Sequence, residues 1–575
     1  MGSRRRAGAV AGALLLAGSL LAGCANIPTG GRPVAVRNVP PGAVGDEPDV
    51  RQEPREPGTG DSPDRVVRGF LAAAKSATEG HAIARAYLTL TALDGWKDSA
   101  GTRIISLDNL RVEPSGAPGR VQVLLTGRYQ ARIADDGAYV PDDSALRVTY
   151  ELRQVAGEWR IDNPPPGVLL PADDFQQVYK AVDLYFISPD GQTVVPDRRY
   201  FDVKQGVLAT RMTNRLLAGP SDWLSAGVRT AFPAGTRLRS NVVLVGDVLL
   251  VDLSSEVLAA SHSDQVALAA QLVWTLTKRF AVRGVQLLAD GRPLRLLGAN
   301  GVLDRQAYSS YDPRVLTTRV PGYFLAAGSL RSTGDQPVTG PAAAPHAGLT
   351  SVAVSADLGR LAAIQAGPAG ARLLLGPLGG PLVPRYAGAA LSRPAWETGA
   401  GAVYVVVGRR AVWRVPVAGA AQQVRVPGLE RLGPPSSIAL SRDGVRVALI
   451  AGPPAGGRLY VGVLTRAGRD VSIGKLQQVA PQVTQVADVA WASEGEMLVL
   501  GRRDAGPVTP YLVDVDGATV TERPTAGLPA DRRALAAAPD EVDLVQADAR
   551  IWRRSGSTWL PVRGGDPGSA PVYPG

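Results

Sequence analysis

Two stretches decide the fold of the C-terminal part of the chain: Val352-Ala-Val-Ser-Ala-Asp-Leu-Gly-Arg-Leu-Ala-Ala-Ile364 and Ile438-Ala-Leu-Ser-Arg-Asp-Gly-Val-Arg-Val-Ala-Leu-Ile450. Each contains an apolar strand, a turn with Asp and Gly, and a second apolar strand. The pattern returns with variations around Trp396, Trp491 and Ala537. This internal similarity indicates a repeated structural unit.

The length of the repeat indicates the architecture. Equivalent positions are 42, 44, 51 and 46 residues apart when the repeats are aligned on Val354, Trp396, Leu440, Trp491 and Ala537. A period in the forties with three or four short strands per unit is typical of β-propeller blades. We therefore predict an all-β propeller of about five or six blades over residues 315–575. Tyr323–Leu330 resembles a blade strand and is predicted to close the ring or to belong to a sixth blade.

Residues 62–170 predict a smaller domain that contains helices and strands. An amphipathic helix begins near Ser62, and a second helical stretch spans His81–Leu90. Alternating strands follow, and the last of them, Trp159–Pro165, resembles the final strand of NTF2-like domains. We expect an α+β fold for this unit.

Residues 175–300 predict a second α+β domain. Hairpin turns are expected at Gly246-Asp247 and Asp290-Gly291, and a long helix over Ser263–Phe280. Four short blocks resemble the GerMN domain family and occur in the family's order: Leu184-Tyr-Phe186, Leu217-Ala-Gly-Pro-Ser221, Val251-Asp-Leu-Ser254 and Ala270-Gln-Leu-Val-Trp-Thr-Leu276. The resemblance implies no established catalytic activity, so it assigns no catalytic residue.

The N-terminus predicts the cellular compartment. Arg4-Arg5-Arg6 precede an apolar run, Ala7–Ala22, that is short for a membrane-spanning helix. The run ends in Leu21-Ala-Gly-Cys24, a lipobox. We predict a lipoprotein signal peptide over residues 1–23 that is cleaved between Gly23 and Cys24. Cys24 would then carry S-diacylglycerol and N-acyl groups, and two or more acyl chains anchor a protein stably. The alternative is a buried free cysteine at the end of an N-terminal helix.

Residues 24–61 follow the predicted cleavage site and are rich in Pro, Gly and charged residues. They show almost no apolar periodicity, which predicts a tether. A flexible coil of this length reaches about 35 Å. The folded domains would therefore stand clear of the lipid surface.

The composition argues against several classes of function. The chain has one Cys and three His among 575 residues, so neither a disulfide framework nor a Cys-based zinc site is expected. The net charge of +10 comes from arginines spread along the chain, which argues against nucleic-acid binding. The sequence has no Gly-rich phosphate loop of the P-loop type. We expect no metal and no cofactor.

An enzyme would need a set of catalytic side chains that the sequence does not suggest. We interpret His81 as a helix residue, His262 as solvated beside a helix cap at Ser263, and His346 as exposed in a linker. The carboxylate pairs Asp142-Asp143, Asp173-Asp174 and Asp514/Asp516 fall in turns or loops, and Asp514/Asp516 lack the other ligands of a calcium loop. We predict that the protein is not an enzyme. A cell-wall hydrolase is the weakest alternative.

Four arginine pairs recur in the predicted propeller: Arg409-Arg410, Arg502-Arg503, Arg532-Arg533 and Arg553-Arg554. They suggest a basic rim for acidic lipid head groups, an anionic wall polymer or an acidic protein. The competing interpretation is a set of separate, solvated arginines. Trp396 and Trp491 occupy equivalent repeat positions, which favours the interior of the blades over an exposed glycan platform.

Lipobox, tether, NTF2-like unit, GerMN unit and propeller together resemble the LpqB family of actinobacterial lipoproteins. The resemblance implies an accessory protein on the outer face of the cytoplasmic membrane. It also implies a partner, the extracytoplasmic domain of an MtrB-like sensor histidine kinase of MtrAB-type signalling, with effects on cell-wall and division processes. A receptor for a cell-wall glycan or lipid, without a kinase partner, remains the alternative.

Overall fold

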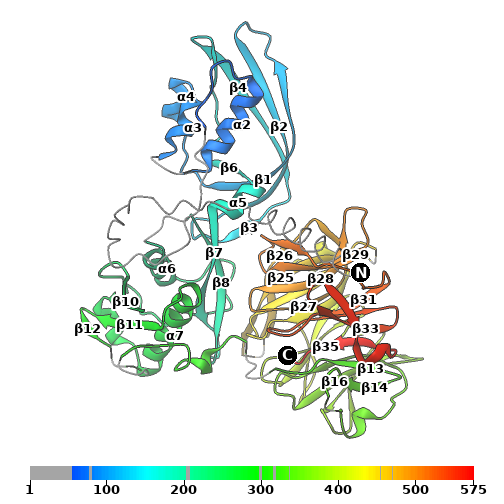
Figure 1. Ribbon diagram of the computed structural model, residues 1–575. Coiled ribbons are helices and arrows are strands. Elements are labelled where there is room, and N and C mark those ends of the chain that lie inside the picture. The colour runs from blue at the N-terminus through cyan, green and yellow to red at the C-terminus, as the bar shows by residue number, and fades with distance from the viewer. Residues whose placement is uncertain are drawn as a thin grey trace, which may run out of the picture. The chain divides into compact units, whose positions relative to one another are not determined.

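The computed structural model describes residues 55–575, except 77–79, 203–206, 295, 297–300, 315–318, 336, 454 and 469. The predicted signal peptide and most of the predicted tether lie outside the described residues. The described residues belong to one unit, in which three domains follow one another along the chain (Figure 1).

The N-terminal domain packs helices against a six-stranded sheet of order β5-β4-β2-β1-β6, with β3 paired to β2. Helix α2 has Pro63 in its first turn and buries Val67, Phe70 and Leu71. The helices are α2 (Pro63–Ala74), α3 (Ala82–Ala86), α4 (Leu90–Gly95) and α5 (Ala172–Val178). The strands are β1 (Thr102–Pro114), β2 (Arg120–Ile133), β3 (Tyr139–Pro141), β4 (Ala145–Val155), β5 (Glu158–Ile161) and β6 (Val168–Pro171).

The prediction of one helical stretch over His81–Leu90 is wrong. The chain leaves helical geometry after α3 because it pairs with the sheet: Leu88 bridges Ile161, and the Thr89 amide donates to the Ile161 carbonyl at 2.9 Å. Thr89 then caps α4, since its side chain accepts a hydrogen bond from the Ala92 amide. Strand β1 was not predicted because most of its side chains are exposed and show no regular apolar alternation.

The second domain combines a hairpin, a four-stranded sheet and two helices. Strands β10 and β11 run parallel, so the chain crosses between them through α7, as parallel pairing requires. The predicted turns at Gly246-Asp247 and Asp290-Gly291 are confirmed. The elements are β7 (Tyr179–Ile187), β8 (Val194–Asp202), α6 (Leu208–Leu217), β9 (Val243–Val245), β10 (Val248–Leu253), α7 (His262–Arg279), β11 (Gly284–Ala289) and β12 (Arg292–Pro293).

Helix α7 supplies polar as well as apolar groups to the interior of this domain. Gln271 donates to the Tyr185 carbonyl at 3.0 Å and accepts from the Ala231 amide at 2.7 Å. Thr275 accepts from the Tyr185 amide at 3.0 Å. These bonds fix the helix to β7, because a buried polar group without a partner is costly. The cap of α7 is Ser261 rather than the predicted Ser263.

The third domain is a propeller whose described residues form six blades. Five blades have four strands each and follow one another in sequence. Blade 1 is β15 (Leu349–Val354), β16 (Arg360–Gly367), β17 (Gly370–Pro377) and β18 (Val383–Gly388); blade 2 is β19 (Ala395–Trp396), β20 (Ala402–Val407), β21 (Ala411–Pro416) and β22 (Gln422–Gln423); blade 3 is β23 (Pro435–Leu440), β24 (Arg446–Ala451), β25 (Arg458–Ala467) and β26 (Asp470–Gln478); blade 4 is β27 (Val483–Trp491), β28 (Glu496–Arg503), β29 (Val508–Asp514) and β30 (Val520–Glu522); blade 5 is β31 (Arg532–Ala536), β32 (Leu544–Ala547), β33 (Arg550–Ser555) and β34 (Thr558–Pro561).

The sixth blade closes the ring with strands from both ends of the domain. Strand β35 (Ser569–Val572) pairs with β13 (Tyr323–Ala326), which pairs with β14 (Ser329–Ser332); Figure 1 draws the red β35 beside the green β13 and β14. The innermost strands contact each other in the cyclic order β15, β19, β23, β27, β31 and β35. The prediction that Tyr323–Leu330 belongs to a sixth blade or closes the ring is therefore confirmed.

The repeated Ser-x-Asp motif explains why the two stretches that define the repeat fold alike. The Ser355 hydroxyl donates to Asp357 and the Ser441 hydroxyl to Asp443, at 2.5 Å in both blades. Each aspartate also accepts a backbone N–H two residues onward, as in an Asx-turn. The motif therefore fixes the tight turn between the first and second strands of blades 1 and 3.

Candidate functional site

The predicted lipidation site, Gly23 and Cys24, lies outside the described residues. Cleavage and acylation there stay predictions. Among the described residues, no helix is long and apolar enough to span a membrane.

The three histidines lie far apart in the fold. His81 is partly buried beside Trp96, with ring centroids 5.7 Å apart, and burial lowers its pKa. His262 is exposed at the start of α7, as predicted. The prediction that His346 is exposed is wrong, because it is half-buried and its Nε2 lies 2.9 Å from the Pro341 carbonyl. Within the described ranges, no group of three His, Cys, Asp or Glu side chains is arranged to hold a metal ion.

The candidate carboxylates contact partners within the protein. Asp143 pairs with Arg128 at 2.8 Å, and Asp174 pairs with Lys75 at 3.0 Å. Asp142 accepts from the Ser144 amide. These contacts are ordinary ion pairs and turn bonds.

Asp514 and Asp516 contact the second domain. Arg198 on β8 pairs with Asp514 at 2.8 Å and with Asp183 at 3.0 Å. The Tyr200 hydroxyl donates to Asp516 at 2.9 Å. Burial raises the pKa of Asp516 to about 6, against the opposing effect of the Arg198 charge. The turn that the sequence suggested as a weak calcium loop therefore connects propeller blade 4 to the second domain.

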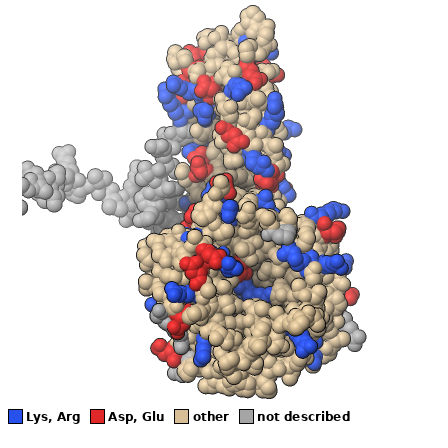
Figure 2. Space-filling view, turned by 90° about the vertical axis from the view of Figure 1, so that its right-hand side faces the viewer, with Lys and Arg blue, Asp and Glu red and all other residues tan. Residues whose placement is uncertain are grey.

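The four arginine pairs do not form a continuous basic rim. In three of the pairs, one arginine is partly buried and donates a hydrogen bond within the protein. Arg409 donates to the Gly452 carbonyl, Arg532 to the Val508 carbonyl and Arg554 to Asp543. The exposed members are Arg410, Arg503, Arg533 and Arg553. Figure 2 shows basic and acidic side chains interspersed on the face it draws, with basic side chains in a hollow of the lower half.

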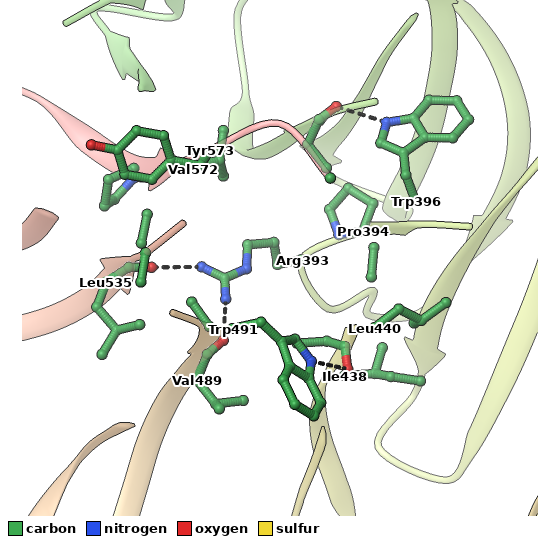
Figure 3. Close-up of a pocket in the computed structure, with 18 of the residues that line it drawn as sticks. Arg393, Pro394, Trp396, Ile438, Leu440, Val489, Trp491, Leu535, Val572 and Tyr573 are labelled. Carbon is green, nitrogen blue, oxygen red and sulfur yellow. Dashed lines mark hydrogen bonds between the residues drawn. The ribbon is translucent and has the colours of Figure 1, made fainter. Parts of the chain in front are cut away.

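One candidate site is the central cavity of the propeller, about 70 Å³ in volume (Figure 3). Its walls are the innermost strands of the blades. Much of the lining is apolar or aromatic: Trp396, Ile438, Leu440, Trp491, Val572 and Tyr573. Two arginines, Arg393 and Arg442, also line it.

The two tryptophans of this lining hold neighbouring blades together. Trp396 donates from Nε1 to the Ala353 carbonyl at 3.0 Å, and Trp491 donates to the Ala439 carbonyl at 3.3 Å. Figure 3 shows both bonds. Both side chains are buried, so the interpretation of these repeat positions as blade interior is confirmed.

Arg393 crosses the cavity from blade 2 to blades 4 and 5. Its Nη1 and Nη2 donate to the two oxygens of Asp488 at 3.0 and 2.8 Å. They also donate to the carbonyls of Leu535 and Val489, and Figure 3 shows these two bonds. Asp488 in turn accepts from the amides of Val489 and Leu535. Burial raises the pKa of Asp488, but the ion pair and the two amides oppose this. The pair therefore fastens three blades across the centre of the ring.

The sequence analysis did not identify Arg393, Asp488 or Arg442. A signal was present for the first two, because each stands three residues before the aligned tryptophan of its repeat. Arg393 and Asp488 therefore occupy equivalent positions in two blades and carry opposite charges. Because equivalent positions of propeller blades face a common axis, such a pair predicts a contact across the centre. Nothing in the sequence distinguishes Arg442 from the other arginines.

Three family descriptions match successive parts of the chain. "Lipoprotein LpqB, N-terminal domain" matches residues 56–176, and "Sporulation and spore germination" matches residues 183–295. "Lipoprotein LpqB beta-propeller domain" matches residues 328–574. Lipoprotein LpqB of Thermobifida fusca is 31% identical over 97% of both chains. Lipoprotein LpqB of Mycobacterium tuberculosis is 32% identical over 98% of both chains.

The chain belongs to the LpqB lipoprotein family. The predicted fold class, two α+β domains followed by a propeller, is confirmed. The LpqB relatives carry the name of a lipoprotein and not of an enzyme.

Solved structures resemble parts of this LpqB chain. TolB from Acinetobacter baumannii is 13% identical, with 46% of this chain and 69% of TolB covered and a TM-score of 0.35. The first GerMN domain of the sporulation protein GerM from Bacillus subtilis is 24% identical, with 22% of this chain and 98% of that domain covered and a TM-score of 0.19.

Proposed function

We propose that this LpqB-family protein is a lipid-anchored accessory protein on the outer face of the cytoplasmic membrane. It binds the extracytoplasmic domain of a sensor histidine kinase and modulates two-component signalling that affects cell-wall and division processes. The observation that carries the proposal is the lipobox Leu21–Cys24, at the start of a chain that matches LpqB lipoproteins along nearly its full length. The kinase partner is what the family resemblance implies.

Anchoring supports such a role physically. A lipid-anchored protein and a membrane kinase share one plane, so their effective concentration is high and weak contacts suffice. Binding shifts the kinase between states only if the accessory protein prefers one of them. The ion pair of Arg198 with Asp514 and the bond of Tyr200 to Asp516 join propeller and second domain.

One observation favours a second candidate function, a receptor for an anionic cell-wall polymer. The exposed members of the four arginine pairs, Arg410, Arg503, Arg533 and Arg553, all lie on the propeller. Cationic side chains attract polyanions at long range, and salt weakens that attraction. This candidate needs no kinase.

Cross-linking in native membranes tests the proposal. The full-length protein, tagged at its C-terminus, is cross-linked in its own host membranes, purified and analysed by mass spectrometry. We expect a sensor kinase in the cross-linked fraction, and its loss when residues 328–574 are deleted. Recovery of wall polymer without any kinase would overturn the proposal in favour of the receptor.

Cys24→Ala tests the anchor separately. The variant should leave the membrane fraction and lose the kinase cross-link, because it lacks the acceptor thiol. Asn26→Ala, two residues onward, is the matched control and should stay in the membrane. Equal membrane retention of both variants would contradict the anchor.

A further inference from the structure

Arg442 is a partly buried cation with no carboxylate within ion-pair distance among the described residues. It lies in the turn after the innermost strand of blade 3 and lines the central cavity. Its Nη2 donates to the Pro574 carbonyl at 2.5 Å. Its Nε and Nη1 are buried and have no hydrogen-bond partner within the described part of the chain. No ion pair found there includes Arg442.

The other arginine of the cavity shows what a compensated site looks like. Arg393 has a carboxylate on both terminal nitrogens, whereas Arg442 has a single neutral carbonyl. Asp488 pairs with Arg393, so it does not compensate the charge of Arg442.

Arg442 remains protonated at neutral pH. Burial lowers its pKa to about 10, and the charge of Glu541 opposes this shift without forming an ion pair within 4 Å. An unpaired buried charge is costly, and a bound anion would compensate it. The cavity is therefore electrostatically suited to one negative charge.

The size and lining of the cavity restrict the anion further. A volume of 70 Å³ holds roughly five to seven non-hydrogen atoms, since one water needs about 10–15 Å³ of such space. Trp396, Trp491 and Leu440 offer apolar surface to the uncharged part of a ligand. The exposed Gly575 lines the same cavity, so the cavity reaches the protein surface there.

We propose that the central cavity of the propeller binds a short monocarboxylate, with its carboxylate on Arg442 and its aliphatic part against the tryptophan-lined wall. A dianion such as phosphate would leave one negative charge uncompensated among apolar side chains. Nucleotides and oligosaccharides exceed the available volume. The inference is independent of the proposed kinase partner, because it rests on the propeller alone.

Calorimetric titration of the full-length protein in detergent tests this inference. The probes are sodium propionate, sodium butyrate and sodium phosphate at matched ionic strength. Propionate and butyrate should bind with one site per chain, and phosphate should bind more weakly. Arg442→Met should weaken carboxylate binding at least about tenfold, the value of one charge-assisted hydrogen bond. Arg410→Met, which removes an exposed arginine of the same domain, should leave the affinity unchanged.

Two further measurements keep the test decisive. The melting temperature of the wild type should rise with propionate, and that of Arg442→Met should not. If Arg442→Met does not fold, Arg442→Lys keeps the charge and should bind propionate with reduced affinity. Equal binding by wild type and Arg442→Met, no saturable binding, or phosphate binding as tight as propionate would overturn the proposal.

Discussion

A buried arginine in the second domain and one in the propeller differ in how their charge is compensated. Arg199 on β8 is fully buried, and its Nη2 lies 2.5 Å from Asp197, which also accepts from the amide and hydroxyl of Ser221. Arg442 has a carbonyl but no carboxylate among the described residues. Arg199 stabilises the fold together with its counter-ion. Arg442 has no such counter-ion, so its charge can attract a ligand.

The largest effect is expected from breaking the compensated site. Asp197→Asn would take from the buried Arg199 its nearer carboxylate and leave Asp136 at 3.6 Å. We therefore expect the free energy of unfolding to fall by about 3–5 kcal/mol. Urea unfolding of the full chain measures this. Asp247→Asn is the matched control, since its pair with Arg283 is mostly exposed at 64% and 56%, and it should cost about 0–1 kcal/mol. Equal losses would contradict the distinction between the two kinds of site.

The contact between the two domains should respond to pH. Burial raises the pKa of Asp516 to about 6 from 3.8, so the folded state binds its proton more tightly than the unfolded state. This stabilisation is complete below pH 3.8 and is lost as the pH rises through 6. The effect is on the order of a few kcal/mol. The neighbouring charged and titratable groups are Arg198, Asp514 and Tyr200.

The measurement for Asp516 compares pH profiles of stability. Asp516→Asn should flatten the part of the profile between pH 4 and 6 relative to the wild type. Asp531→Asn, an exposed residue paired with Arg533 on the propeller surface, should keep the wild-type profile. If the stability of Asp516→Asn changed with pH as that of the wild type does, the pKa of Asp516 would not be raised by folding.

A smaller effect is expected from the neutral buried groups of the second domain. Gln271→Leu removes the bonds to Tyr185 and Ala231 and leaves a buried carbonyl and amide without partners. We expect a loss of about 1–3 kcal/mol by thermal or urea unfolding. Thr277→Val is the control on the same helix, because the Thr277 hydroxyl donates to the Val273 carbonyl of its own turn and has no other bond within the described part of the chain. A larger loss for Thr277→Val would refute the role given to Gln271.

The smallest effect on stability is expected at Arg442. Arg442→Met removes a partly buried charge that has no carboxylate partner among the described residues, so stability should stay within about 1 kcal/mol of the wild type or rise. Arg393→Met is the contrast, because it strands the Asp488 carboxylate that Arg393 pairs with at 2.8 Å. That variant should be clearly destabilised in the same assay. A large loss for Arg442→Met would place Arg442 among the structural arginines.

The propeller could be predicted because its sequence repeats regularly. Its number of blades could not be predicted in the same way. The regular steps between Trp396, Trp491 and their equivalents indicated blades, and two of the repeats fold by the same local Ser-x-Asp turn. The number of blades stayed open because β13 and β14 join β35 from the opposite end of the domain. Likewise, the break between α3 and α4 depends on pairing with the distant Ile161.

The candidate sites divide in the same way. Cys24 is predicted from a local motif alone, and Trp396 and Trp491 from their repeat positions. The partners of Asp514 and Asp516 come from β8, more than 300 residues earlier, so no local pattern predicts them. Arg442 differs from the other arginines in its spatial neighbours, because two of its nitrogens have no hydrogen-bond partner among the described residues. The sequence does not show this.

The most direct test of the uncompensated site is a crystal structure of the protein soaked with 3-bromopropionate, in which the bromine is located by its anomalous scattering. We predict a bromine peak inside the central cavity, beside Trp396 and Trp491, with the carboxylate on the Arg442 guanidinium. The peak should be absent from crystals of Arg442→Met. Bromine found only at exposed arginines such as Arg410, or an empty cavity in the wild type, would contradict the assignment.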